Sequence, residues 1–172
     1  MNNLRELTGY TDMRDAKHPL EGKLSEADSR LLKHGYLASV TYVDTQVGKL
    51  LARLDELGIA DNTIVVLWGD NGWKLGEHAS WCKMTNFETD TRVPLMIRAP
   101  GIGPAVCSQF VEFVDVYPTL CELTGLDLPP ELEGQSAAPI MRDPARAGKD
   151  AARSQFFRSG IWKAPDGRDY MG

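Results

Sequence analysis

Apolar side chains between residues 36 and 57 recur at alternating steps of four and three residues. This spacing puts them on one face of an α-helix. Ser25 can accept hydrogen bonds at the helix start, where Asp28 also suits the positive end of the helix dipole. Gly58 is typical of the residue just beyond a helix end. The pattern predicts a helix over Ser25–Leu57 with an apolar stripe, which needs a sheet to cover it: Tyr36, Val40, Val43, Val47, Leu50, Leu54 and Leu57.

A continuous apolar run of strand length occupies Ile64–Trp68 and is rich in β-branched residues. Such a run is typical of a strand that is buried on both faces, as in a parallel sheet. Pro94–Arg98 is a second predicted strand, and the Pro- and Gly-rich stretch 99–104 after it predicts a turn. The sequence therefore predicts a fold of the α/β class.

The signals that follow this turn are shorter. Val111–Val114 predicts a short extended piece. Asp115 can cap a helix that runs to Glu122 or Leu123, and Gly125 suits the end of that helix. The helix would be the second in the chain.

The carboxyl-terminal stretch is rich in Pro, Gly and polar residues. Residues 145–153 predict either a short polar helix or a linker, and Ser154–Phe157 predicts a further strand. We expect a loop over 1–24, an α/β segment over 25–134 and a loop-rich tail over 135–172. These elements supply about half of a complete α/β domain, because a fully buried strand needs neighbouring strands on both sides and helices on both faces.

Oxygen-bearing side chains follow the first predicted strand directly. Asp70 and Asn71 stand between Gly69 and Gly72. One interpretation is a hairpin turn that leads into Lys74–His78, because Asn-Gly is a strong hairpin signal, although that stretch does not alternate. The other is a metal site, because ligands collect at the carboxyl ends of strands in α/β sheets, and Asp and Asn oxygens suit Ca²⁺ or Mg²⁺. Two ligands are too few for Ca²⁺, which binds about six to eight oxygens.

The stretch from Trp73 to the second predicted strand shows no clear helical or strand period. A loop of this length inside a compact domain is usually functional or disordered. Trp73 and Trp81 argue against disorder and are expected to be packing walls. Glu77 either orients a neighbour by a hydrogen bond or is solvated, and Asp44 is expected on the helix surface.

Several short motifs occur together in this loop and just beyond it: Gly69–Trp73, Leu75–His78, Trp81–Lys83, Asn86–Phe87 and Val93–Leu95. The stretches Tyr36–Asp44 and Val114–Leu120 flank them. In this order and spacing they resemble the carboxyl-side metal and substrate segment of the sulfatase family, in particular its iduronate-2-sulfatase-like and choline-sulfatase-like members. The resemblance covers Tyr36–Gly134 and places the chain in the alkaline-phosphatase-like superfamily.

The resemblance implies part of a mixed sheet sandwiched by helices, incomplete in this chain, and sulfuric ester hydrolysis as the activity. It implies Asp70 and Asn71 as ligands of Ca²⁺, with Mg²⁺ as the alternative. It implies Lys83 as a catalytic cation that binds the sulfate oxygens or the leaving-group side. His78 matches a motif position and is assigned to substrate binding, with its role less defined. Without the resemblance, Lys83 would be interpreted as a solvated loop lysine.

The family's nucleophile is a formylglycine made from Cys or Ser in a Cys/Ser-x-Pro-x-Arg motif. None of Cys82, Cys107 and Cys121 is followed by that pattern, and no serine is either. The family's paired upstream aspartates also have no match in this sequence. We therefore expect this chain alone to be inactive. The substrate of a full-length relative would be a sulfated small molecule or a sulfated glycan.

Composition adds limits rather than a function. The net charge of −5, without a basic run, argues against a nucleic-acid partner. No apolar run approaches the ~18 residues of a membrane span, and the first residues hold no apolar signal core, although this leaves export and localisation open. The three cysteines are expected to be buried free thiols.

Two other functions stay open on the sequence. The chain is either a catalytically inactive, truncated sulfatase-like remnant that acts as a folded or binding piece, or part of a phosphodiesterase of the same superfamily. The missing nucleophile motif favours the remnant for this polypeptide alone, and the intact metal and lysine motifs favour a sulfatase ancestry.

Overall fold

The computed structural model describes residues 7, 13, 16, 21–155, 157–163 and 169–171. The chain divides into two compact units. Unit 1 comprises Met1–Met96 together with Gln155–Gly172, and unit 2 comprises Ile97–Ser154. Most of the loop predicted over 1–24 lies outside the described residues, and that prediction stays open.

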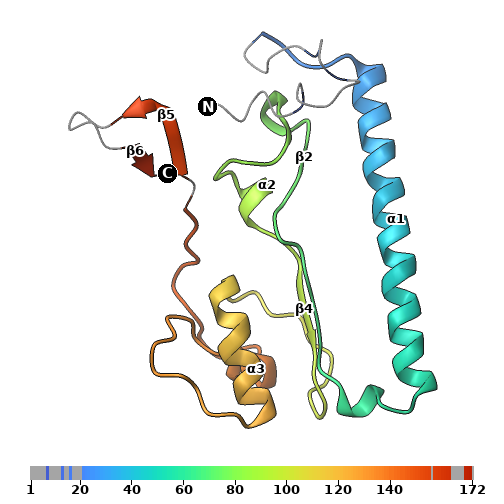
Figure 1. The fold of residues 1–172 in the computed structure, drawn as a ribbon, viewed down its shortest axis with the longest axis vertical. Coiled ribbons are helices and arrows are strands. Elements are labelled where there is room, and N and C mark those ends of the chain that lie inside the picture. Colours follow the sequence, from blue (N-terminus) through green and yellow to red (C-terminus); the bar gives the residue numbers. More distant parts are fainter. Residues whose placement is uncertain are drawn as a thin grey trace. The chain divides into compact units, whose positions relative to one another are not determined.

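The long predicted helix is confirmed as α1, Glu26–Glu56, in unit 1 (Figure 1). Ser25 is its N-cap residue, and the Ser25 hydroxyl oxygen accepts a hydrogen bond from the Asp28 backbone N–H at 3.0 Å. Gly58 follows the helix with a φ of 66°, in the left-handed region that glycine tolerates best. Local capping signals thus fix both ends of α1.

The apolar stripe of α1 remains uncovered within the described part of the chain, where no α1 residue is buried. Leu50 is 69% exposed and Val43 is 55% exposed. α1 contacts β2 (Lys74–Leu75) and the 3₁₀-helix η3 (Ala60–Asn62). The sheet that the stripe needs is therefore not supplied by the described residues.

Both predicted strands are confirmed as β1, Val65–Trp68, and β4, Leu95–Arg98, which pair in a two-stranded sheet. The Gly69 backbone N–H donates to the Pro94 carbonyl oxygen at 3.0 Å and extends this pairing. β1 is less buried than its apolar sequence predicts, and Trp68 is 47% exposed. The reason is that β4 is its one neighbouring strand among the described residues.

The connection between β1 and β4 has more structure than its sequence pattern predicts. β2 pairs antiparallel with β3 (Trp81–Cys82) across the 3₁₀-helix η4 (Glu77–Ala79). The short helix α2 (Glu88–Thr91) follows. The hairpin interpretation of the Asp70–Asn71 turn is wrong, because β2 pairs with β3 rather than with β1.

A small apolar cluster includes several side chains of this connection. Trp81, Cys82 and Leu7 are its buried members. Partly buried apolar side chains pack against them: Met13, Ala16, Leu24, Leu32, Trp73 and Leu75. The expected packing role of Trp73 and Trp81 is confirmed.

In unit 2 the second predicted helix is confirmed as α3, Val116–Thr124. It ends at Gly125, whose φ is 71°, as predicted. Phe113–Asp115 forms the 3₁₀-helix η5, so the extended piece predicted over Val111–Val114 is wrong at its carboxyl end. The short helix α4 (Ala138–Arg142), which contacts α3, was not predicted.

Asp115 is the N-cap residue of α3, as predicted, but its side chain makes no capping hydrogen bond to that helix. The carboxylate of Asp115 instead accepts the backbone N–H groups of Glu112 and Gln135, each at 2.8 Å. The side chain therefore joins η5 to the segment before α4, while the residue itself stands at the start of α3.

The carboxyl-terminal predictions were partly wrong. Residues 145–153 contain no helix, so the helix alternative is wrong. The strand predicted over Ser154–Phe157 is wrong for its first residues, because β5 spans Phe157–Lys163. β5 pairs antiparallel with β6, Asp169–Met171.

The cysteine prediction holds for two of its three members. Cys82 and Cys121 are buried thiols, as expected. Cys107 is free but exposed, so burial is wrong for this residue. Cys107 stands in the irregular stretch after β4, where no described element covers it.

Candidate functional site

The predicted metal ligands stand at the carboxyl end of β1. Asp70 and Asn71 are both exposed. Gly72 follows them and donates its backbone N–H to the Asp90 carbonyl oxygen at 2.8 Å. A Cβ on Gly72 would lie 1.9 Å from the carbonyl oxygen of Thr89, so only glycine allows this close approach. The turn that carries Asp70 and Asn71 is thus held against α2.

A fully buried ion pair lies beneath this turn. The Lys74 ammonium donates to both carboxylate oxygens of Asp90, at 2.8 and 2.7 Å. Each of the two side chains is 1% exposed. A buried charge is tolerated when an opposite charge and hydrogen bonds compensate it, and the pair meets both conditions.

The carboxylate of Asp90 also holds the segment after Lys83. Thr85 donates both its backbone N–H and its hydroxyl to this carboxylate, each at 2.7 Å. Gly72 binds the Asp90 backbone, and Thr85 binds the Asp90 side chain. Asp90 therefore links the residue two positions after Asp70 to the residue two positions after Lys83.

Lys83 lies in a stretch of unusual backbone conformation. It is half-buried between Cys82 and Met84, whose φ values are 65° and 77°. His78 and Ala79, at 54° and 55°, lie in the same left-handed region. Residues other than glycine adopt this region at a cost of roughly 1–3 kcal/mol, and such residues cluster at functional sites. The conformation is consistent with a functional role for the 78–84 stretch.

His78 and Glu77 each have a defined neighbour. The imidazole ring of His78 stacks on the Phe87 ring, with ring centroids 4.3 Å apart and an interplanar angle of 24°. Glu77 accepts the backbone N–H of Leu75 at 2.6 Å, which supports the interpretation of Glu77 as an orienting residue. Since His78 is itself exposed, this stacking leaves it accessible from solvent.

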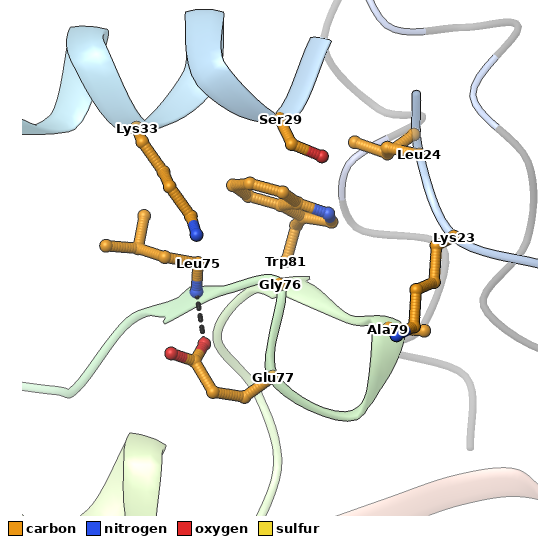
Figure 2. A pocket seen from close by; sticks show the side chains of 9 residues that line it. All are labelled: Lys23, Leu24, Ser29, Lys33, Leu75, Gly76, Glu77, Ala79 and Trp81. Atoms are coloured by element: carbon orange, nitrogen blue, oxygen red, sulfur yellow. Dashed lines mark hydrogen bonds between the residues drawn. The ribbon is translucent and has the colours of Figure 1, made fainter. Parts of the chain in front are cut away.

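A pocket of about 350 Å³ opens beside the β2–β3 hairpin (Figure 2). Figure 2 shows the Trp81 indole facing Ser29 of α1, with Lys33 above Leu75. The pocket is lined by Lys23, Leu24, Ser29, Lys33, Leu75, Gly76, Glu77, Ala79 and Trp81. Neither the predicted metal ligands nor Lys83 line it, so it is distinct from the predicted site.

The donors fit a hard cation in chemistry but not in number. Asp70 and Asn71 offer one carboxylate and one amide oxygen at a strand end, which are the oxygen types that Ca²⁺ and Mg²⁺ prefer. The described residues contain no cluster of three or more His, Cys, Asp or Glu side chains that could hold a metal ion. These two residues could therefore provide only part of a coordination shell.

Sequence reasoning missed Lys74, Asp90 and Thr85, which organise the loop. Lys74 and Asp90 are 16 residues apart in the sequence, so no helical or strand period connects them. A lysine and an aspartate in a polar loop are normally expected at the surface. No local signal in the sequence could have identified them as a buried pair.

Comparison with known proteins assigns the family. The family model for sulfatases matches residues 10–126. The chain is 39% identical over 135 residues to iduronate 2-sulfatase of Mus musculus, covering 63% of this chain and 24% of that protein. It is 34% identical over 152 residues to choline-sulfatase of Rhizobium meliloti, covering 81% of this chain and 30% of that protein. The chain thus spans about a quarter to a third of these relatives.

Solved structures show the same relationship. A structure in complex with its substrate D-glucosamine-2-N,6-O-disulfate matches with a TM-score of 0.66 at 31% identity, over 80% of this chain and 28% of that one. A phosphonate monoester hydrolase from Silicibacter pomeroyi matches with a TM-score of 0.65 at 29% identity, over 91% of this chain and 32% of that one. The fold is accordingly the α/β fold of the alkaline-phosphatase-like proteins, as expected, and the chain belongs to the sulfatase family.

Proposed function

We propose that this chain forms the metal- and sulfate-binding part of a sulfuric ester hydrolase. The observation that carries the proposal is the double link made by Asp90, which joins the turn after Asp70 and Asn71 to the segment after Lys83. A loop held in this way keeps a metal-binding turn and a cationic side chain in a fixed relation. Membership of the sulfatase family supports the same function.

Sulfate-ester hydrolysis must stabilise negative charge on the sulfate group and on the departing oxygen. Asp70 and Asn71 are proposed to hold Ca²⁺, or Mg²⁺ in its place, and a bound divalent cation would supply positive charge toward the sulfate oxygens. Lys83 contributes a second positive charge as the catalytic cation, and His78 lines the substrate side. The remaining metal ligands come from groups other than the described residues.

The substrate class follows from the relatives. Their names refer to iduronate and choline sulfates, and one solved structure holds a disulfated glucosamine. We propose a sulfated small molecule or a sulfated glycan as the substrate of the complete enzyme. Because no cysteine or serine of this chain stands in a Cys/Ser-x-Pro-x-Arg motif, the formylglycine precursor has to come from another segment, and the isolated chain is expected to release no sulfate.

A hybrid enzyme tests the proposal. The 172-residue chain replaces the matching segment of the Rhizobium meliloti choline-sulfatase, and release of sulfate from choline sulfate is measured. Asp70→Ala is expected to abolish the activity. Lys83→Ala is expected to lower kcat by about 10²–10³, the effect of removing one donor to a developing oxyanion.

Asp44 on the exposed surface of α1 provides a matched control. The hybrid carrying Asp44→Asn should retain its activity. A hybrid that keeps full activity with Asp70→Ala would refute the assignment of Asp70 as a metal ligand. A hybrid that keeps full activity with Lys83→Ala would refute the catalytic role of that lysine.

The phosphonate monoester hydrolase among the similar structures favours a second candidate, a phosphodiesterase of the same superfamily. The hybrid distinguishes the two functions when it is offered a phosphodiester and a phosphonate monoester beside the sulfate ester. Preference for the sulfate ester supports the first proposal. Preference for the phosphodiester or the phosphonate monoester supports the second.

A further inference from the structure

Lys74 and Asp90 are buried, charged and outside the chemistry proposed above. Asp90 contacts both parts of the proposed site. Its carbonyl oxygen accepts the N–H of Gly72, next to the metal-binding turn, and its carboxylate accepts the N–H of Thr85, in the segment after Lys83. We infer that Lys74 and Asp90 form a positioning pair, which sets the register between the metal-binding turn and Lys83. This inference rests on the proposed function and names the residues that keep its two parts aligned.

Burial fixes the orientation of the Lys74 and Asp90 side chains. Each of the two side chains is only 1% exposed, so neither charge can turn toward water without opening the loop. The Lys74 ammonium bridges both oxygens of Asp90 and thereby fixes the plane of the carboxylate. In that orientation one oxygen also meets the N–H and the hydroxyl of Thr85 at 2.7 Å. Lys74 thus positions the acceptor that holds the segment after Lys83.

An apolar pair of similar volume would hold the loop closed without this orientation. Replacement of a buried ion pair by apolar residues often leaves stability unchanged or higher. The role inferred for the Lys74–Asp90 pair is therefore the specific arrangement that it selects, rather than added stability. The double variant Lys74→Met/Asp90→Leu separates packing from positioning. It keeps the packed volume of the loop but removes the acceptor for Thr85.

Paramagnetic relaxation by Mn²⁺ measures the arrangement directly on the 172-residue chain. Mn²⁺ prefers the same oxygen ligands as Ca²⁺ and Mg²⁺, so it serves as the probe for the turn at Asp70 and Asn71. The measured quantity is the ratio of the relaxation enhancement at the Lys83 amide to that at the Gly72 amide. The enhancement falls with the sixth power of distance, so this ratio reports small changes in register.

The ratio is expected to change more than twofold in the folded Lys74→Met/Asp90→Leu variant. Glu88→Gln is the matched control, because it breaks an ion pair of 3.8 Å with Arg92 in the same segment whose side chains are 79% and 82% exposed. The control should keep the wild-type ratio. Thr85→Val, which removes one tie to Asp90 without touching the buried charges, should change the ratio in the same direction by a smaller amount.

The outcomes separate the two claims. Enhancement that is absent from Gly69–Gly72 in the wild-type chain overturns the proposed metal site and the inference with it. Enhancement at that turn with a ratio that stays at the wild-type value in the folded double variant overturns the inference alone. If the double variant does not fold, an unchanged ratio in Thr85→Val overturns the inference in its place.

Discussion

Both units join a lysine to carboxylates, but they bury these groups to different degrees. In unit 1, Lys74 and Asp90 are each 1% exposed and bind one another through both carboxylate oxygens. In unit 2, Lys149 is 16% exposed and contacts Glu112 and Asp115, which are 18% and 3% exposed. Backbone N–H groups of Gln135 and Arg153 add to that second cluster.

The difference lies in burial rather than in the donors. In both units the carboxylates also receive backbone N–H groups, which remain when the lysine is removed. In unit 1, however, the loss of Lys74 leaves the Asp90 charge fully buried, whereas in unit 2 Glu112 keeps contact with water. Both arrangements fasten irregular segments that have few ladder hydrogen bonds of their own. The buried pair therefore depends on both of its members, whereas the partly exposed cluster tolerates the loss of one.

The largest effect is expected from breaking the pair in unit 1. Lys74→Met should lower the free energy of unfolding by about 3–5 kcal/mol, because it leaves a buried carboxylate without its counter-charge. Lys74→Met/Asp90→Leu should recover part of that loss, because the buried charge is gone but the N–H and hydroxyl of Thr85 lack their acceptor. Urea denaturation followed by tryptophan fluorescence measures both variants. A loss below about 1 kcal/mol in the single variant, the value of an exposed pair, would contradict the comparison.

A smaller effect is expected in unit 2. Lys149→Met should cost about 1–3 kcal/mol, the penalty of leaving hydrogen-bonding groups partly unsatisfied. Hydrogen exchange at the amides of Gln135 and Arg153 measures the loosening of this cluster. Arg142→Met, which removes an ion pair to Glu122 that is 52% and 33% exposed, is the control and should leave those amides protected. A loss as large as that of Lys74→Met would remove the distinction between the units.

Acid should weaken unit 2 through Glu112. The hydrogen bond from Lys149 and the backbone N–H of Arg153 hold the pKa of Glu112 below its ordinary value of 4.5. Because this pKa is lower in the folded state, the stabilisation is present above about pH 4.5 and is lost as the pH falls through the folded-state pKa. Hydrogen exchange of unit 2 against pH should show this loss. In Lys149→Met the loss attributable to Glu112 should shrink, and an unchanged acid profile would show that Lys149 does not lower the pKa of Glu112.

At high pH the stability of unit 2 depends on pH in the opposite direction, through Lys149. Burial lowers the pKa of Lys149, but its hydrogen bonds to Asp115 and Glu112 outweigh burial and raise that pKa above 10.5. The cluster therefore contributes its stability below about pH 10.5 and loses it as the pH rises through the folded-state pKa of Lys149. Between the acid limit set by Glu112 and the basic limit set by Lys149, the contribution of this cluster to stability should stay constant.

The smallest effect is expected from an exposed pair. Glu88→Gln should change the free energy of unfolding by less than about 1 kcal/mol, because solvent screens both partners of the Glu88–Arg92 pair. The same urea titration that is used for Lys74→Met measures it. An effect comparable to that of Lys74→Met would show that position in the loop, rather than burial, sets the energy.

The sequence predicted the elements whose signals are local. α1 was found because its apolar positions follow the helical period and Ser25 caps its start. β1 and β4 were found from their apolar runs. Asp70 and Asn71 were located at the strand end that the α/β rule predicts, and family motifs rather than periodicity singled out Lys83 and His78. Their roles stay predictions.

The interactions that hold the loop could not be predicted, because they connect residues far apart in the sequence. Asp90 meets Lys74 across 16 residues, and Lys149 meets Asp115 across 34. The burial of β1 was overestimated for a related reason, since strand burial depends on neighbours that the strand's own sequence does not reveal.

In the described part of the chain, no helix is both long enough and apolar enough to cross a membrane.

The central claim is that Asp70 and Asn71 hold a divalent cation, and titration of the isotope-labelled chain with CaCl₂ tests it most directly. Nuclear magnetic resonance follows the amide shifts along the chain. We predict shifts centred on Gly69–Gly72 with a midpoint no tighter than the millimolar range of weak sites, because only a few protein oxygens are offered. The shifts should disappear in Asp70→Ala. Micromolar Ca²⁺ binding that survives Asp70→Ala would contradict the claim and place the cation elsewhere.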